Sequence, residues 1–176
     1  MDIIQIFDDK IPFVDRSWIY EMCTKSTFFI RGWSDRTDLE LTNKHDLHSK
    51  WSLEDLNRSG ILPYLEKILT KSKFSKYKLD NFSHCSINAV KPNDYYYIHS
   101  HLRGTLSILY YVNLEWNPNW SGETIFYESD MKNIKFASPY IPGRFILFEE
   151  EPHTIRTQSI NGPSWRFTMA IFLKKN

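Results

Sequence analysis

Three histidines in the second half of the chain have the spacing of metal ligands, and an arginine follows them. His99 and His101 lie two residues apart after a run of tyrosines, and His153 follows far downstream. Residues two apart on a β-strand point to the same side, so this pair can offer two imidazoles to one ion. Arg166 lies on a later apolar segment of strand character. Together these residues predict a metal centre built between strands.

His101 stands where one common type of iron centre has a carboxylate. Non-haem Fe(II) enzymes hold the metal with two histidines and one carboxylate, which leaves the remaining positions open to co-substrate and oxygen. The first histidine and the carboxylate of that pattern lie two apart on one strand, as His99 and His101 do, and a third ligand comes from a distant strand, as His153 would. The spacing agrees with such a centre, whereas the residue type at position 101 departs from it.

Residues 96–172 resemble the 2-oxoglutarate-dependent iron oxygenases, and most closely their prolyl 4-hydroxylase-like branch. Short segments carry the resemblance, namely 96–101, 109–116, 121–127, 142–148, 152–155 and 165–168. Each segment alone is a weak match, but all of them in the same order and spacing are not expected by chance. The residues before 77 resemble the helical support of that family only in outline.

The resemblance implies a role for each matching residue. His99 and His153 would bind the metal. Arg166 would pair with the distal carboxylate of 2-oxoglutarate, where a planar guanidinium can form two parallel hydrogen bonds. Tyr111 would donate a hydrogen bond to the same carboxylate. The resemblance thus implies an intact co-substrate site.

Further implications of the resemblance concern the pocket, the cofactors and the reaction. Tyr96 would line the co-substrate pocket, and Thr168, two residues after Arg166, would share its face. Fe(II) and 2-oxoglutarate would be required, with ascorbate as an accompanying reductant. The expected activity is hydroxylation of a C–H bond in a protein, of the prolyl type, or in a small molecule.

The role of His101 admits three interpretations. The favoured one is that His101 binds the iron, and a neutral imidazole then leaves the metal with one more net positive charge than a carboxylate would. Alternatively, His101 swings away and leaves room for water or a halide. In the third interpretation a carboxylate from elsewhere completes the centre, with Glu123 and residues 149–151 as candidates.

Two rival functions remain beside the 2-oxoglutarate-dependent oxygenase. The first is a three-histidine dioxygenase that uses oxygen without 2-oxoglutarate, against which Arg166 argues. The second is a non-catalytic binding module on the same fold. A binding module has no need of His99, His153 and Arg166 together, so their joint presence argues against that rival.

The pattern along the chain predicts a mainly β fold with flanking helices. From residue 77 onward apolar and polar residues alternate with period two, in short runs separated by Gly, Pro and Asn. Many short strands at regular spacing are typical of a sandwich or barrel. We expect a double-stranded β-helix, the jelly roll of cupins. The whole chain, 1–176, would form one domain, with helical support and substrate-side loops in 1–75 and the jelly-roll core in 76–176.

The first part of the chain is mixed. A short strand and turn are expected within 3–14, a helix over 16–25 capped by Asp15, and a strand over 27–33. Residues 35–47, in a polar stretch that extends to position 48, would form a loop that covers the substrate.

A helical segment follows this loop. Ser52 and Asp55 have the spacing of a capping arrangement at a helix start. Gly60 and Pro63 then predict two short helices or one kinked helix.

Composition limits the classes of partner and compartment. The chain has 176 residues, 41% of them hydrophobic, with a formal net charge of +1. This balance excludes a bulk electrostatic affinity for nucleic acid or membrane. Cys23 and Cys85 are not expected to form a disulfide, and the first residues show no secretory signal, so a cytoplasmic protein is expected. Richness in Ile, Lys and Asn fits an AT-rich genome, viral or bacterial.

Overall fold

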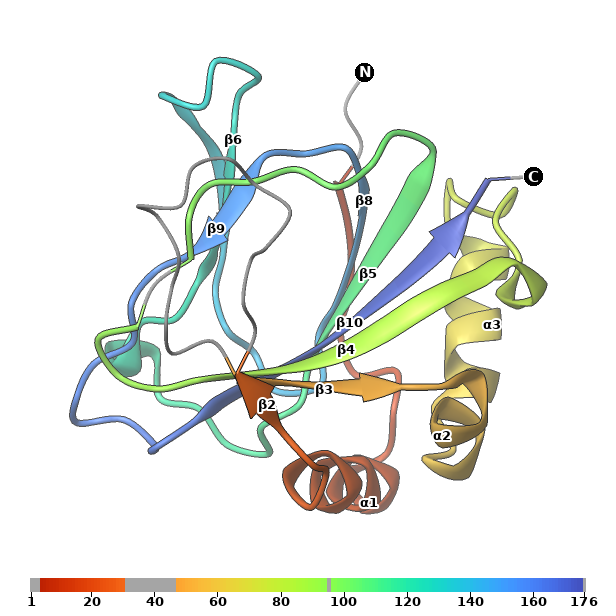
Figure 1. Ribbon diagram of the computed structural model, residues 1–176, viewed down its shortest axis with the longest axis horizontal. Coiled ribbons are helices and arrows are strands. Elements are labelled where there is room, and N and C mark those ends of the chain that lie inside the picture. The colour runs from red at the N-terminus through yellow and green to blue at the C-terminus, as the bar shows by residue number, and fades with distance from the viewer. Residues whose placement is uncertain (1–3, 31–46, 95, 176) are drawn as a thin grey trace.

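The computed structural model describes residues 4–30, 47–94 and 96–175 as two antiparallel sheets with helices on one side (Figure 1). The larger sheet has the strand order β1-β8-β5-β10-β4-β3-β2, and the smaller has the order β7-β6-β9. The strands of the larger sheet are β1 (Ile4–Phe7), β2 (Phe29–Ile30), β3 (Leu47–Trp51), β4 (Phe82–Val90), β5 (Thr105–Tyr111), β8 (Phe145–Glu149) and β10 (Arg166–Lys174). Those of the smaller sheet are β6 (Thr124–Tyr127), β7 (Ile134–Ser138) and β9 (His153–Ile155). The expected jelly roll with flanking helices is confirmed.

The two faces of the central strand β10 contribute to two different apolar clusters. This strand pairs with β4 on one side and β5 on the other, both antiparallel. Because successive strand residues point to opposite faces, alternate residues pack under the helices, namely Phe167, Met169, Ile171 and Leu173. Ala170 and Phe172 belong to the other cluster, on the face toward the smaller sheet. That second face carries the candidate site.

Helices α1 (Phe13–Thr24), α2 (Leu53–Arg58) and α3 (Leu62–Lys71) cover the outer face of the larger sheet (Figure 1). Each helix contributes at least one fully buried side chain, with Ile19, Leu56 and Leu65 all at 0% exposure. Burying such a side chain stabilises the fold by about 1.5–3 kcal/mol. The helices therefore stabilise the sheet from outside and leave its inner face to the site. That the whole chain forms one domain stays a prediction.

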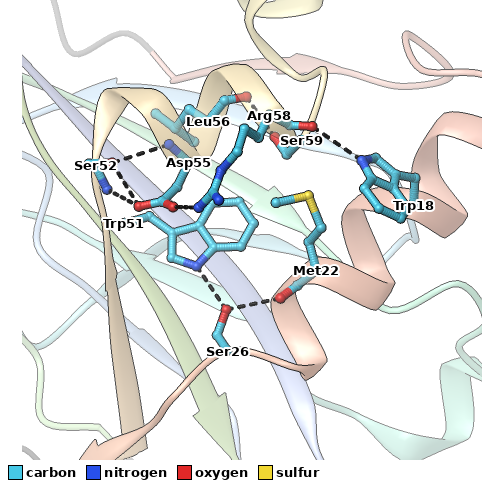
Figure 2. Close-up of polar contacts among 9 residues, drawn as sticks. All are labelled: Trp18, Met22, Ser26, Trp51, Ser52, Asp55, Leu56, Arg58 and Ser59. Atoms are coloured by element: carbon cyan, nitrogen blue, oxygen red, sulfur yellow. Dashed lines mark hydrogen bonds and ion pairs between the residues drawn. The ribbon is translucent and has the colours of Figure 1, made fainter.

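The helix starts show where local sequence signals succeed and fail. The Ser52 hydroxyl accepts a hydrogen bond from the Asp55 backbone N–H at 3.2 Å, and the Asp55 carboxylate accepts one from the Ser52 N–H at 2.8 Å, a complete capping box (Figure 2). The predicted cap at Asp15 is wrong, because α1 begins at Phe13 with Pro12 in the cap position. Asp15 lies in the first turn and accepts a hydrogen bond from the Tyr64 hydroxyl.

Two tryptophans connect the helices to each other and to the edge of the sheet (Figure 2). The Trp51 indole donates to the Ser26 hydroxyl at 2.9 Å, which joins the end of β3 to the segment after α1. The Trp18 indole on α1 donates to the Arg58 carbonyl at the end of α2 at 3.2 Å. These bonds set the spacing between helices that no sequence-local signal specifies.

The expected break between two helices is confirmed. Gly60 has φ +74°, a conformation that favours glycine, and Pro63 lies in the first turn of α3. The loop expected over 35–47 lies outside the described residues except for Leu47, which begins β3 rather than ending a loop, and position 48 likewise belongs to that strand. Within the described part of the chain, no helix is long and apolar enough to cross a membrane.

Candidate metal centre and anion pocket

Three histidines converge on the inner face of the larger sheet. One ring nitrogen of each of His99, His101 and His153 lies within 4.8 Å of the others. Metal–imidazole bonds are about 2.0–2.1 Å long, so a small inward movement would allow all three to bind one ion. Within residues 4–30, 47–94 and 96–175, this is the only group of three or more potential ligands.

The backbone brings the first and last of these histidines together. His99 lies in an extended segment before β5 and forms an isolated bridge with His153, the first residue of β9. The His99 N–H donates to the His153 carbonyl at 3.1 Å, and the His153 N–H donates back at 2.9 Å. Residues distant in sequence are thus held side by side by main-chain bonds that do not involve their rings.

Carbonyl acceptors orient two of the imidazoles. His99 Nδ1 lies 2.9 Å from the Tyr97 carbonyl oxygen, and His153 Nδ1 lies 2.8 Å from the Glu151 carbonyl oxygen. A carbonyl can only accept, so each Nδ1 is assigned the hydrogen and each Nε2 the lone pair that a metal requires. Such outer hydrogen bonds are typical of metal-binding histidines.

His101 is held by a different partner. Its Nδ1 lies 2.5 Å from the hydroxyl of Ser107 on β5, a residue at 0% exposure. Its ring also packs edge-on against Phe172, with ring centroids 4.8 Å apart, and lies 5.9 Å from the Phe148 ring. In this orientation His101 belongs to the cluster and does not swing away from it.

The glutamates considered as replacement ligands do not join the cluster. Each makes another contact: Glu123 with Arg156, Glu149 with Lys76, Glu150 with the Gly104 N–H and Glu151 with Lys135. Among the described residues, the group that could hold a metal therefore contains imidazoles alone.

The protonation of His153 suits a metal ligand. Burial lowers its pKa well below the ordinary value for histidine, and the neighbouring His99 and His101 lower it further. The ring is therefore neutral at pH 7, the form in which imidazole binds a metal.

Arg166 lies at the inner end of the same face with 1% of its surface exposed. Its Nε donates to the Gly122 carbonyl at 2.9 Å, and its two terminal nitrogens donate to the hydroxyls of Thr168 at 2.5 Å and Thr124 at 3.4 Å. In the described part of the chain, no carboxylate pairs with it. A buried charge without a counter-ion is costly, so this position favours binding of an anion.

One cavity of about 520 Å³ connects the histidines with this arginine. Of the residues singled out in the sequence, those on its wall are Tyr96, His99, His101, His153, Arg166 and Thr168. The cavity thus brings the three histidines and the buried arginine to one wall, and their roles toward a metal and an anion stay predictions.

Tyr111 is placed differently from the expectation. It is fully buried beneath Arg166, stacked on Tyr140 with ring centroids 4.3 Å apart, and its hydroxyl donates to Thr124 at 2.7 Å. Thr124 reaches the cavity wall in its place. The sequence offered no local signal for Thr124, because only the packing of the smaller sheet against the larger one brings β6 next to Arg166.

Gly122 is a second residue that the sequence analysis did not single out. Its φ is +84°, and a Cβ there would lie 2.9 Å from the Trp116 ring and 3.4 Å from Cδ of Arg166. Glycine therefore permits the close approach through which its carbonyl accepts the Arg166 hydrogen bond. The Ser-Gly-Glu sequence indicated a turn, but not this contact.

Comparison with known proteins identifies the class of fold. No family model matches the sequence, and no curated protein matches it. Among solved structures, the fold is that of the 2-oxoglutarate- and Fe(II)-dependent oxygenases. The sequence identities to these structures are 15% or lower, so the similarity establishes the fold alone.

Several of the similar structures in that class are prolyl hydroxylases. A prolyl 4-hydroxylase from Pseudomonas putida has a TM-score of 0.71 at 15% identity, covering 97% of this chain and 92% of that one. A prolyl hydroxylase from Trichoplax adhaerens, in complex with a hypoxia inducible factor peptide, has a TM-score of 0.72 at 12% identity and coverages of 98% and 83%. The viral collagen prolyl hydroxylase of Paramecium Bursaria Chlorella virus-1, in complex with 2-oxoglutarate, has a TM-score of 0.66 at 12% identity. The match covers 96% of this chain and 94% of that one.

Proposed function

We propose that this chain is an Fe(II)- and 2-oxoglutarate-dependent dioxygenase that hydroxylates a C–H bond of a protein, of the prolyl type, or of a small molecule. One observation carries the proposal. A buried arginine without a carboxylate partner among the described residues shares a cavity with three converging histidines. A ligand that fits both must be anionic at one end and able to bind a metal at the other.

2-Oxoglutarate has these two ends. Its distal carboxylate would pair with Arg166, whose guanidinium already contacts two threonine hydroxyls on the cavity wall, Thr168 and Thr124. Its keto-acid end would face the histidines. Tyr111 would act beneath the arginine, since its ring lies 5.2 Å from the guanidinium carbon and its hydroxyl orients Thr124.

His99, His101 and His153 would hold Fe(II), which when bound supplies the activation of oxygen for attack on a C–H bond. The donor set fits a divalent transition metal, because each Nδ1 has a hydrogen-bond partner and Nε2 is the nitrogen left to face the ion. Three neutral ligands leave the metal both of its positive charges. A dianionic co-substrate would offset them.

The protein's own part is to position these groups and limit water around them. Phe126 and Phe148 lie next to His153, with ring centroids 5.8 and 4.8 Å from its ring, and belong to the buried core behind it. Apolar surroundings lower the local dielectric and strengthen the polar contacts of this ring. A prolyl substrate is supported by the Trichoplax neighbour, whose structure contains a peptide.

Metal-dependent turnover of 2-oxoglutarate tests the proposal. Purified protein with Fe(II), ascorbate and 2-oxoglutarate is expected to release succinate, whereas Arg166→Gln and His153→Ala are expected to lose this release. Arg156→Gln removes the same charge from an arginine with 62% of its side chain exposed and should behave as wild type. Absence of both succinate release and metal-dependent 2-oxoglutarate binding in the wild type would refute the proposal.

A second candidate is a three-histidine dioxygenase that uses oxygen without 2-oxoglutarate. The observation in its favour is the cluster itself, in which the described residues supply imidazoles alone. Oxygen consumption in the presence of Fe(II) and substrate, but independent of 2-oxoglutarate and unchanged by Arg166→Gln, would favour this candidate.

A further inference from the structure

The cavity continues past the histidines to an open end that carries positive charge. Strand β10 runs along the cavity, and the residues that face it are, in order, Arg166, Thr168, Ala170, Phe172 and Lys174. The first of them is buried, whereas the last is exposed. A single strand therefore places a cation at each end of the cavity.

The register of the sheet locates the histidines between these two cations. Phe172 pairs with Ser107 on β5, and Ser107 is the residue that holds His101. Lys174 pairs with Thr105, two residues further along the same strands. Each strand residue advances about 3.3 Å, so Lys174 lies roughly 7 Å beyond Phe172, on the side away from the buried arginine.

A second cation is close to Lys174 along the backbone, because the Lys175 N–H donates to the Gly104 carbonyl at 2.9 Å. Arg103 lies in the turn that connects His101 to β5, is exposed and lines the same cavity. Among the described residues, neither Arg103 nor Lys174 forms an ion pair, and no aspartate or glutamate lines the cavity. Glu150 accepts a hydrogen bond from the Gly104 N–H at 3.1 Å and is not among the residues that line the cavity.

We propose that the substrate is a peptide carrying an acidic side chain, carboxylate or phosphate, near the residue to be hydroxylated, and that Lys174 and Arg103 bind that acid. This inference rests on the proposed function. There, 2-oxoglutarate would use Arg166 and the metal, so the charge at the open end is not needed for the co-substrate. Two cations that form no ion pair with any described residue then provide a binding site for a negative charge on the substrate.

The arrangement favours a peptide over a nucleic acid. A nucleic-acid groove requires cations spaced along a phosphate backbone, whereas the described lining at this end of the cavity has two cations and the net charge of the chain is only +1. Next to Lys174 the rings of His84 and Phe172 stack with centroids 4.3 Å apart. They form a flat wall against which the substrate residue can pack.

Peptide binding tests this inference without turnover. The probe is a set of fluorescein-labelled, proline-centred peptides that differ only at two flanking positions, which hold Asp, phosphoserine, Asn or Lys. Each is titrated with full-length protein loaded with Mn(II) and 2-oxoglutarate, at low salt. We expect Asp or phosphoserine to bind at least about fivefold more tightly than Asn, and Lys to bind most weakly. The stronger of the two acids identifies the preferred group.

Charge-neutral variants then assign the residues. Lys174→Gln and Arg103→Gln should each reduce the affinity for the acidic peptide about threefold, with no change for the Asn peptide. Lys175→Gln is the matched control, because Lys175 is equally exposed but does not line the cavity. It should leave both affinities unchanged.

Several outcomes would overturn the inference. Equal affinity for all peptides would do so, as would an equal effect of Lys175→Gln, or tighter binding of a competing oligothymidylate. A change in 2-oxoglutarate affinity alone would show that the two cations only attract the co-substrate. Binding of 2-oxoglutarate is titrated separately in the same samples. If the wild type does not bind 2-oxoglutarate, the proposed function is refuted instead.

Discussion

The hydrogen bond between His101 and Ser107 fixes the orientation of the one histidine of the cluster that departs from the usual carboxylate. It holds an imidazole where a carboxylate is usual, at an Nδ1 to Oγ distance of 2.5 Å and inside an apolar wall. If His101 is the third ligand, this serine orients it much as a carbonyl orients each of the other two histidines.

Removing the Ser107 hydroxyl should therefore weaken metal binding. We expect Ser107→Ala to reduce Mn(II) or Co(II) affinity about tenfold, the usual cost of losing an outer hydrogen bond to a ligand, and to alter the visible spectrum of the Co(II) form. Ser59→Ala, which removes another buried hydroxyl at the end of α2, is the control and should change neither. Unchanged metal affinity in Ser107→Ala would mean that His101 is not held as a ligand.

The lowered pKa of His153 predicts how the metal-free protein responds to acid. Its folded-state pKa lies below its unfolded value of about 6.5, so between the two values the unfolded chain binds more protons. Stability is then fully present above pH 6.5 and falls as the pH drops below it, by up to about 1.4 kcal/mol per pH unit. Urea unfolding from pH 8 to pH 5 with chelator measures this slope. His153→Asn should flatten it, and an unchanged slope would contradict the assignment.

At the scale of elements, the turn before β6 determines how close the smaller sheet comes to Arg166. Gly122 adopts a φ of +84° there, with the Trp116 ring and Arg166 directly against it. Gly104 has a similar φ of +76° but nothing within 4 Å of a built Cβ. A substitution at Gly104 therefore tests the backbone strain alone, whereas one at Gly122 tests the strain together with side-chain crowding.

Alanine at these two glycines should have different effects. Gly104→Ala is expected to cost about 1 kcal/mol from the left-handed backbone alone. Gly122→Ala should cost more and should also lower 2-oxoglutarate affinity, because Arg166 must shift. Denaturant unfolding and co-substrate titration of both variants test this. Equal effects of the two substitutions on both measurements would argue against a close packing role for Gly122.

Elements with local signals were predictable from the sequence, and contacts between elements were not. The capping box at Ser52 was predicted because both partners lie within one turn. The cap at Asp15 was not correct, since a proline three residues earlier starts the helix sooner. Thr124 and Ser107 escaped notice because their roles depend on strands that meet only in the folded sheets.

At the scale of the whole molecule, strand pairing within each sheet and the packing of the two sheets against each other bring the site together. β10 supplies Arg166, β9 supplies His153, and the extended segment before β5 supplies His99 and His101. The period-two alternation of apolar and polar residues, with the turn residues between the runs, predicted the β fold. The distances between the site residues, and the position of Tyr111 behind Thr124, required the register of both sheets.

The most direct test of the account is a calorimetric titration of 2-oxoglutarate into the full-length protein with and without Mn(II). The account predicts that the Mn(II)-loaded wild type and Arg156→Gln bind 2-oxoglutarate. Arg166→Gln should lose at least about tenfold in affinity because a buried charge-assisted pair is broken. Chelating the metal should cause a similar loss of affinity because the metal that binds the keto-acid end is removed. Binding that is unaffected by both Arg166→Gln and metal removal would contradict it.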